Sequence, residues 1–446
     1  MGGDSAAPDG LAPAKLSSRA ARFVVYGMLH SQFIINYVSR LSIPYMVSFI
    51  SRDLSLTALQ SSRLISAFVP GYVATQIPAS WVLEALGAKA VLTMNNFAVA
   101  LLMLSIPVAA RHSMTALQGC FFGLGVAQGP FIVAQNVMTA ETVPHGPERP
   151  WALMAIRQGS NIAKLTASVA TPLLCASALT WRRTSTLYAT IAGLYGCFWH
   201  LLLPTPKRAG SGNSNVPESV SAASATKVPF SWRLLVTKPA LACVGSHFSR
   251  DFIEFHTLAA WAPLFFNEVH GVALGSVGKY TTGAMAVQVV GKVMVAAWES
   301  ARLQRGTPTL LIRKQADGLA SLLGSFFLFC FSVAPTPGIA AICYIGTLGG
   351  HCFDYAAHIP NELEVGGADT GKLGAAINTL CWTVNFLFAQ VAAALKQRTG
   401  SYKAVLWLPI VFRLLSGFNY QLHASCDTAR EHLRKHRGAA ANPSTL

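Results

Sequence analysis

The amino-acid sequence predicts an all-α membrane protein with twelve transmembrane helices in two six-helix bundles. Only 12% of the 446 residues are charged, against about 25% in soluble domains. The mean hydropathy is +0.43 and 52% of the residues are hydrophobic. Twelve stretches are apolar over about 20 residues, the length that crosses a bilayer. A polar segment near the middle of the chain divides them six and six, which suggests an internal duplication.

The first bundle is expected over 22–204 and the second over 238–424. In chain order, the predicted spans are 23–50, 62–84, 89–110, 114–140, 151–178, 184–204, 239–267, 277–300, 308–334, 338–360, 370–395 and 402–424. Between the bundles, 205–237 contains AGSGNSNVPESVSAASATK, a composition typical of a flexible linker. Residues 1–21 and 425–446 are expected to be cytosolic tails. The first tail is expected to be disordered, with a remnant of a transit peptide as the alternative.

The net charge of +16 fits membrane topology rather than nucleic-acid binding. Nineteen Lys and Arg residues lie in or beside gaps on the side of the termini, and nine lie on the other side. Cytosolic loops carry the excess of basic residues, so the termini and the linker are predicted to face the cytosol or a stroma-like equivalent. Nucleic-acid binding needs a basic soluble face, and no soluble domain is long enough to carry one.

The sequence gives no indication of an enzyme. The nine cysteines are scattered, mostly in apolar segments, without the spacing of a metal site or a disulfide framework. There is no phosphate-binding Gly-Lys loop, nucleophile elbow or metal-ligand spacing. We therefore expect no catalysis, no ATP-driven pumping, no cofactor and no metal, and a chain that acts as a monomer.

Two arginines lie inside predicted spans that are equivalent in the two halves. Arg40 is well inside the first span, and Arg250 is about one third into the seventh. A charged residue at mid-membrane costs roughly 2.5–3.5 kcal/mol on the insertion scale and is functional by default. The planar guanidinium suits a carboxylate or a phosphate. We therefore favour an anion site between the halves over a purely structural pairing of these arginines.

Four further basic residues lie inside spans. Arg157 and Lys164 are seven residues apart on the fifth span and share one helix face. Lys164 is deep and is a candidate substrate-binding residue, whereas Arg157 fits snorkelling to the cytosolic surface equally well. Lys292 is similarly deep in the eighth span. Arg413, in the twelfth, fits better as an edge or packing residue.

Acidic residues and histidines supply candidates for ion coupling. Glu254 follows Arg250 by four residues, so an intrahelical ion pair is possible. Glu254 is either the partner that neutralises Arg250 or a proton carrier, because burial favours the protonated carboxyl. Asp354 lies between His351 and His358, which are seven residues apart. This group is either a proton relay, because His titrates near neutrality, or a polar cluster that packs helices.

Polar side chains within several spans are candidate substrate contacts. Each of these side chains, taken singly, is equally well explained as a polar group of the bundle core that is hydrogen-bonded within the protein. They are Tyr37, Tyr45, Tyr72, Gln76, Asn136, Asn378 and Asn385, of which the last two share one face of the eleventh span.

Five segments, taken together, are similar to sequence motifs of a known protein family. They are NYVSRLSIPY (Asn36–Tyr45), SAFVPGYVATQIPASWVLEALGAK (Ser66–Lys89), VPHGPERPWALMAIRQGSNIA, SRDFIEFHTLAAWAPLFF and WESARLQRGTPTLLIRK (Trp298–Lys314). Over nearly its whole length the chain resembles the major facilitator superfamily. Within it, the chain is similar to the anion:cation symporter family, which includes vesicular glutamate transporters, sialin and plastid phosphate transporters.

The resemblance implies the major facilitator fold and transport of an anion by alternating access. Sodium, protons or the membrane potential would drive it. In that family the arginines of the first and seventh helices are associated with substrate, which carries over to Arg40 and Arg250. Glu299 and the pair Arg313-Lys314 match the acid and the basic pair of the loop after the eighth helix.

Several positions depart from the family pattern. The segment GVAQGPFIVAQN places Gln128 at the fourth-helix glutamate and Phe121 where an arginine often stands. Ser39 replaces the first-helix aspartate, and Glu84 is the loop acid in a degraded context. The usual coupling acid of the first half is therefore neutral.

Two outcomes fit these departures. Either coupling has moved to Glu254 or to Asp354 with His351, or the protein is a facilitator or uniporter. Lys164 is a candidate replacement for the lost positive charge. A non-transporting receptor or scaffold on the same fold is a second class, which the retention of Arg40 and Arg250 disfavours.

The expected function is secondary active transport of a small anion. Its partners would be the anionic substrate, a coupling sodium ion or proton, and the lipid bilayer. Inorganic phosphate, a dicarboxylate, an acidic sugar and glutamate all suit a basic cavity. The plasma membrane, a vesicular membrane and the plastid envelope all suit a multi-pass integral membrane protein of this kind.

Overall fold

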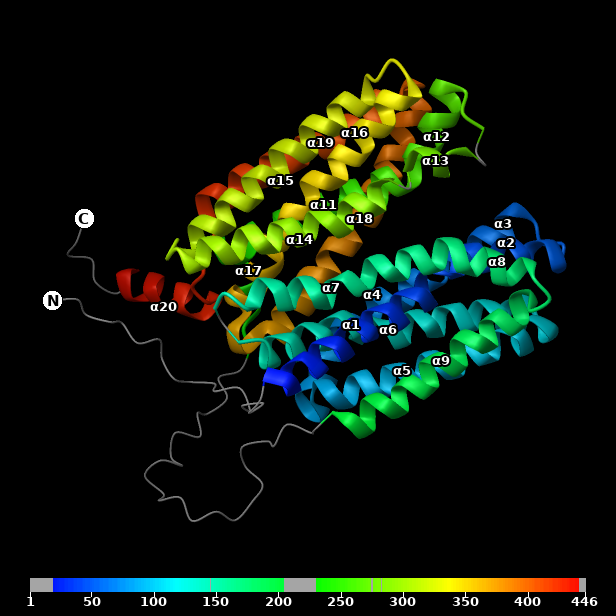
Figure 1. Ribbon diagram of the computed structural model, residues 1–446, viewed down its shortest axis with the longest axis horizontal. Helices are drawn as coiled ribbons and strands as arrows, with labels where there is room; N and C mark the ends of the chain where they lie inside the picture. The colour runs from blue at the N-terminus through cyan, green and yellow to red at the C-terminus, as the bar shows by residue number, and fades with distance from the viewer. Residues whose placement is uncertain (1–18, 145, 204–229, 274–275, 282, 441–446) are drawn as a thin grey trace, which may run out of the picture.

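The computed structural model describes residues 19–440, apart from 145, 204–229, 274–275 and 282, and these residues contain no β-strand. The first group of helices comprises α1 (Arg19–Leu41), α2 (Ile43–Asp53), α3 (Ala58–Ser66), α4 (Phe68–Leu86), α5 (Ala88–His112), α6 (Met114–Thr142), α7 (Arg149–Leu165), η1 (Thr166–Ala170), α8 (Thr171–Ala176) and α9 (Thr180–Leu202). Figure 1 shows these helices packed together in one bundle.

The second bundle lies beside the first (Figure 1). After the short turn η2 (Trp232–Leu234), it comprises α11 (Lys238–Asp251), η3 (Phe252–Leu258), α12 (Ala259–His270), α13 (Gly278–Thr281), α14 (Gly283–Gln304), α15 (Thr309–Ser332), α16 (Pro337–Gly350), η5 (His351–Ala356), α17 (His358–Gly366), η6 (Gly367–Asp369), α18 (Thr370–Thr399) and α19 (Tyr402–His423). Consecutive short helices continue one another, so the prediction of twelve spans in two bundles is confirmed.

The helix ends differ from the predicted span ends by a few residues in most cases. The tenth span is longer than predicted, because α17 continues it to Gly366. Parts of three predicted segments lie outside the described residues. They are residues 1–18 of the tail predicted over 1–21, most of the linker predicted over 205–237, and residues 441–446 of the second tail. Within the predicted tail 425–446, α20 (Ala429–Ala440) is a further helix.

Helix α20 packs on the end of the second bundle. Ala429 is buried there, and Leu433 contacts the apolar cluster that includes Tyr420. Arg430 Nη2 donates to Asp369 Oδ1 at 2.7 Å, and this hydrogen bond raises the pKa of Arg430. Its apolar side is short and its ionic contacts come from distant residues, which explains why the sequence predicted only a tail here.

The outer faces of both bundles are apolar, as a bilayer requires. Leu201, Phe418 and Leu101 are among the large hydrophobic side chains that stay exposed, the first at 77% of its surface. By length and composition, five described helical stretches can each cross a membrane: Arg22–Asp53, Ala88–His112, Met114–Thr142, Thr309–Ser332 and Pro337–Thr399, the last spanning more than one helix. The other spans carry more polar residues, and several of these face the protein interior.

Glycines bring α4 and α6 into backbone contact. A Cβ on Gly125 would lie 2.0 Å from the carbonyl oxygen of Phe68, and one on Gly71 would lie 2.4 Å from that of Phe122. Small residues allow this close approach of membrane helices. The packing holds α4, and with it Tyr72 and Gln76, against the middle of the first bundle.

Gly125→Val is expected to prevent formation of a stable first bundle. The added atoms meet backbone rather than a movable side chain, so the cost should exceed the roughly 1–3 kcal/mol of ordinary overpacking. Gly119→Val on the same helix is the matched control, because its Cβ would meet nothing within 4 Å. Thermal unfolding and size-exclusion profiles of the two purified variants check this, and equal stability would contradict it.

The two bundles contact each other at the end where α20 lies. Lys372 Nζ on α18 pairs with Glu84 Oε1 on α4 at 2.7 Å, and Ser300 Oγ donates to the carbonyl of Pro147 at 2.9 Å. Figure 1 shows the bundles diverging toward α3 and α8 on one side and α12 and α13 on the other.

The loop after the eighth span is fixed by a buried ion cluster. Arg313 Nη1 donates to Glu299 and to the carbonyl of Ala356, and Arg313 Nη2 donates to Glu364 Oε1 at 2.7 Å. The resemblance had set Glu299 and Arg313 apart as motif residues. The structure shows that they bind each other and tie α14, α15 and α17 together.

Candidate functional site

Irregular helix segments lie where the intramembrane charges are found. The fifth span changes from α7 into the π-helix η1 after Leu165, the residue that follows Lys164, and the seventh changes from α11 into the π-helix η3 directly after Asp251. Pro172 and Pro263 follow these segments, and a proline leaves a preceding carbonyl without its helical donor. Such π segments are frequent at functional sites. Here they carry Glu254 and lie beside Lys164.

Arg40 lies among aromatic rings that come from both bundles. Its guanidinium carbon is 4.5 Å from the ring centre of Tyr72 and 4.6 Å from that of Trp382, with Phe68 at 5.1 Å. Tyr72 and Phe68 belong to α4, and Trp382 belongs to α18. Among the described residues no carboxylate forms an ion pair with Arg40. Its fork of N–H donors therefore has capacity for an external anion.

Arg250, in contrast, is already paired with carboxylates. Its Nη2 donates to Glu254 Oε2 at 2.7 Å, and its Nη1 donates to Asp251 Oδ1 at 2.9 Å. Glu254 also accepts from Lys164 Nζ at 2.7 Å and from Gln288 Nε2 at 3.1 Å. The contact with Lys164 joins the first bundle to the second. Glu254 thus occupies both cations as an internal anion.

The deep lysine of the eighth span has a different environment. Lys292 is buried, donates to Asn161 Oδ1 at 3.1 Å and lies over the ring of Tyr355 at 4.0 Å. Arg157 donates to Asn136 Oδ1 at 2.9 Å and lies over the ring of Phe33, so it does not snorkel to the surface. In the described part of the chain, neither cation forms an ion pair with a carboxylate.

The predicted polar contacts divide into two groups. Asn378 Nδ2 donates to Gln76 Oε1 at 2.7 Å and to the hydroxyl of Tyr72 at 3.3 Å, which links α18 to α4 beside Arg40. Tyr37 is within electrostatic range of Arg40, Arg157 and Asp251. Tyr45 is exposed, and Asn385 contacts the Phe248 carbonyl at 3.5 Å within the second bundle.

The positions that depart from the family pattern are packed into the first bundle. Phe121 is fully buried in the apolar core beside Leu117 and Leu124. Gln128 is buried, and its Nε2 has no hydrogen-bond partner among the described residues. No charge therefore stands at either position, in agreement with the sequence.

A second polar cluster fills the interior of the second bundle. Arg413 is completely buried, and its Nη2 donates to Asp354 Oδ1 at 2.7 Å, with Asp317 Oδ1 at 3.7 Å. Asp354 also contacts His351 Nδ1 at 3.0 Å and His358 Nδ1 at 3.4 Å. Arg413 is thus a central partner of Asp354 and not an edge residue. The predicted coupling role of Asp354 and His351 stays a prediction.

Sequence reasoning missed His247 and Glu362. His247 Nδ1 contacts Glu362 Oε1 at 2.8 Å, and its Nε2 contacts Asp251 Oδ2 at 3.3 Å. The i, i+4 spacing of His247 to Asp251, and of His358 to Glu362, was a usable signal in the sequence. The link from α11 to α17 was not visible, since 115 positions separate its two ends.

Known proteins place this architecture in a family. The chain is 22% identical over 382 residues to the probable anion transporter 4, chloroplastic, of Arabidopsis thaliana, covering 81% of this chain and 69% of that protein. It is 22% identical over 373 residues to the voltage-gated purine nucleotide uniporter SLC17A9 of Homo sapiens, covering 82% and 83%. Its fold is similar to a crystal structure of the transporter FucP, with a TM-score of 0.68, 14% identity, and coverage of 91% and 99%.

The family model of the Major Facilitator Superfamily matches residues 28–362, which is most of the chain. One relative is named a probable anion transporter, and the fold match covers nearly the whole chain. The protein is therefore a multi-pass integral membrane protein, and it belongs to the Major Facilitator Superfamily.

Proposed function

We propose that this protein is a secondary transporter of a small anion, inorganic phosphate or an organic anion, which it binds between the two bundles. The main support for this proposal is that several cations at the bundle interface have no carboxylate in ion-pair contact. Arg40, Arg157 and Lys292 form no ion pair with a carboxylate among the described residues, although each is at least half-buried. Buried cations without a carboxylate in ion-pair contact are costly, and a bound anion would offset that cost.

Arg40 is the proposed primary contact. Its aromatic neighbours come from α4 and α18, so they fix the guanidinium at a place that both bundles share. Tyr37, Tyr72, Gln76 and Asn378 supply hydroxyl and amide groups around it. Rocking of the bundles about this place would expose the anion to each side of the membrane in turn.

Arg250 and Lys164 would contribute only when Glu254 releases them. Glu254 pairs with each cation at 2.7 Å, and Asp251 also pairs with Arg250. An incoming anion competes with Glu254 for the same two groups. Protonation of Glu254 removes the competitor, so proton binding and anion binding would favour each other. This supports Glu254 as the coupling residue, in place of the neutral Gln128.

The membrane potential sets the need for coupling. An inside-negative potential opposes entry of an anion by about 2.3 kcal/mol per charge per 100 mV. Uptake into the cytosol therefore requires a co-transported cation, whereas export does not. Uncoupled movement is the second candidate, favoured by the neutral Gln128 and by the similarity to a protein named as a uniporter.

Flux into proteoliposomes tests the proposal. Purified protein should give saturable uptake of at least one anion from a panel of phosphate, dicarboxylates, acidic sugars, glutamate and nucleotides. Imposed proton, sodium and potential gradients, applied singly, identify the driving force. Protein-free liposomes and a neutral sugar are the controls. If monodisperse, folded protein takes up none of these anions, the result contradicts a transport function and favours a receptor or scaffold.

A further inference from the structure

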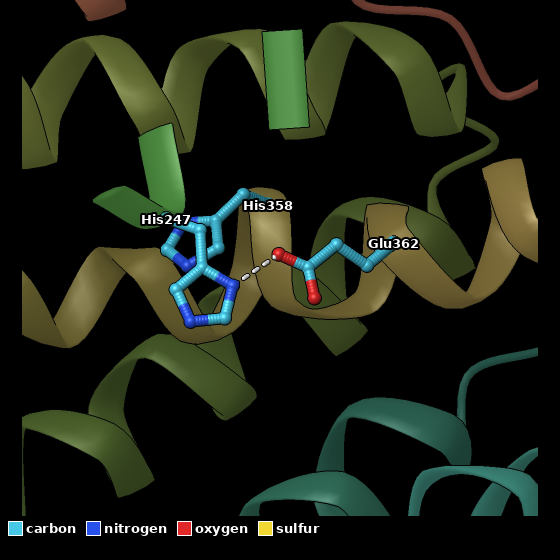
Figure 2. Close-up of side chains that lie close together, drawn as sticks. All are labelled: His247, His358 and Glu362. Atoms are coloured by element: carbon cyan, nitrogen blue, oxygen red, sulfur yellow. Dashed lines mark hydrogen bonds and ion pairs between the residues drawn. The ribbon is translucent and has the colours of Figure 1, made fainter. Parts of the chain in front are cut away.

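Three potential metal ligands from two helices meet inside the second bundle. His247 lies on α11, whereas His358 and Glu362 lie four residues apart on one face of α17. One ligand atom of each residue lies within 4.8 Å of those of the other two. Figure 2 shows the two imidazole rings beside each other, with Glu362 directed toward His247.

Each histidine has its other ring nitrogen on a carboxylate. His247 Nε2 is 3.3 Å from Asp251 Oδ2, and His358 Nδ1 is 3.4 Å from Asp354 Oδ1. Metal-binding histidines in proteins almost always donate their second N–H to a carboxylate, a carbonyl or water, which fixes the tautomer. With those N–H groups on Asp251 and Asp354, Nδ1 of His247 and Nε2 of His358 would keep the lone pairs that a metal ion needs.

An independent observation points to an absent ligand at His358. This residue is completely buried, yet its Nε2 has no hydrogen-bond partner among the described residues. A buried polar atom without a hydrogen-bond partner destabilises the folded state, because it has lost its contact with water. A metal ion on Nε2 would satisfy it without disturbing the contact of Nδ1 with Asp354.

Charge and access also fit a cation. Arg250 pairs with Asp251 and Arg413 pairs with Asp354, but Glu362 forms an ion pair only with His247 among the described residues. Arg157 lies within electrostatic range of Glu362 without forming an ion pair. Glu362 is therefore neutralised either by a proton on His247 or by a bound cation. The side chains of His247 and Glu362 keep 16% and 11% of their surface exposed, which leaves an approach to the cluster.

We propose that His247, His358 and Glu362 bind a divalent transition-metal ion of the Zn²⁺ type. Two imidazole nitrogens and one carboxylate suit Zn²⁺ and its neighbours, whereas Ca²⁺ and Mg²⁺ prefer oxygen ligands alone. Three protein ligands leave a coordination position open for water or an anion. The ion would join α11, which carries Arg250, to α17. This inference does not depend on the transported substrate.

Metal titration of the purified full-length protein tests the site. Co²⁺, followed by its visible absorption, is expected to bind at one equivalent per chain and to be displaced by Zn²⁺. His358→Gln and Glu362→Gln should each weaken binding at least tenfold. His112→Gln is the control, because His112 is exposed at the end of α5 and away from the cluster.

The alternative is a protonated His247 that bridges Asp251 and Glu362 with no metal. It predicts no Zn²⁺-displaceable Co²⁺ binding by the wild-type protein, and that result would overturn the proposal. Unchanged binding by both site variants would overturn it as well. If the variants fail to fold, the wild-type melting temperature decides, because a ligand that binds only the folded state must raise it. A melting temperature that Zn²⁺ leaves unchanged rejects the site.

Discussion

Arg40→Gln is expected to reduce anion uptake by about 10- to 100-fold at substrate concentrations below saturation. The substitution removes a charge-assisted contact worth about 1.5–3 kcal/mol, and each 1.4 kcal/mol is a factor of about ten. The loss should appear mainly as a raised KM if Arg40 binds the anion equally in all states. Initial rates in proteoliposomes with equal amounts of inserted protein measure this.

Two control variants separate binding from folding. Arg40→Lys keeps the charge but lacks the planar fork, so its uptake should fall between those of the wild type and Arg40→Gln. Arg63→Gln removes an exposed arginine on α3 and should behave as the wild type. If Arg40→Gln takes up the anion at the wild-type rate and the uptake is still saturable, Arg40 is not part of the binding site.

Glu254→Gln is expected to abolish proton-driven accumulation while anion exchange across the membrane persists. With the potential clamped at zero, a one-unit pH gradient coupled one to one supplies about 1.4 kcal/mol. It therefore supports roughly tenfold accumulation. The variant should accumulate substrate no more than about onefold, because Gln cannot carry the proton. Its apparent affinity for the anion should rise, because Lys164 and Arg250 lose their internal competitor.

Glu268→Gln is the matched control for that experiment. Glu268 is about half exposed and pairs with Lys396 at 3.4 Å, away from the central cations. Tenfold accumulation by Glu254→Gln would place the carrier elsewhere or indicate a different driving ion. Loss of both exchange and accumulation in folded protein would make Glu254 an ion-pair partner that binding requires, not a carrier.

The distinction between Arg40 and Arg250 was not available from the sequence. Both were predicted as arms of one anion clamp because they occupy equivalent spans. The possible pairing of Arg250 with Glu254 was visible, since residues four apart meet on one helix face. The contact of Glu254 with Lys164 was not visible, because the two residues are 90 positions apart and belong to different bundles. Arg250 is paired with Glu254 and Asp251 on its own span, and Glu254 in turn also pairs with Lys164 of the first bundle.

Local chemistry explains which features of this protein could be predicted from its amino-acid sequence. A span needs about 20 apolar residues whatever its neighbours are. The sequence therefore predicted the number of spans, the division into two bundles and the intramembrane charges. Short-range patterns also marked the Asp354 group. These features depend on a single segment and its solvent, which here is lipid.

Which charges remain without a carboxylate partner depends on how the helices pack against one another. Pairing across helices depends on rotation and depth of each helix, and a shift of one residue turns a side chain by about 100° around a helix with 3.6 residues per turn. The packing of Gly125 against Phe68 fixes one such rotation. From packing of this kind follow the aromatic surroundings of Arg40, the two partners of Glu254 and the meeting of His247 with His358 and Glu362.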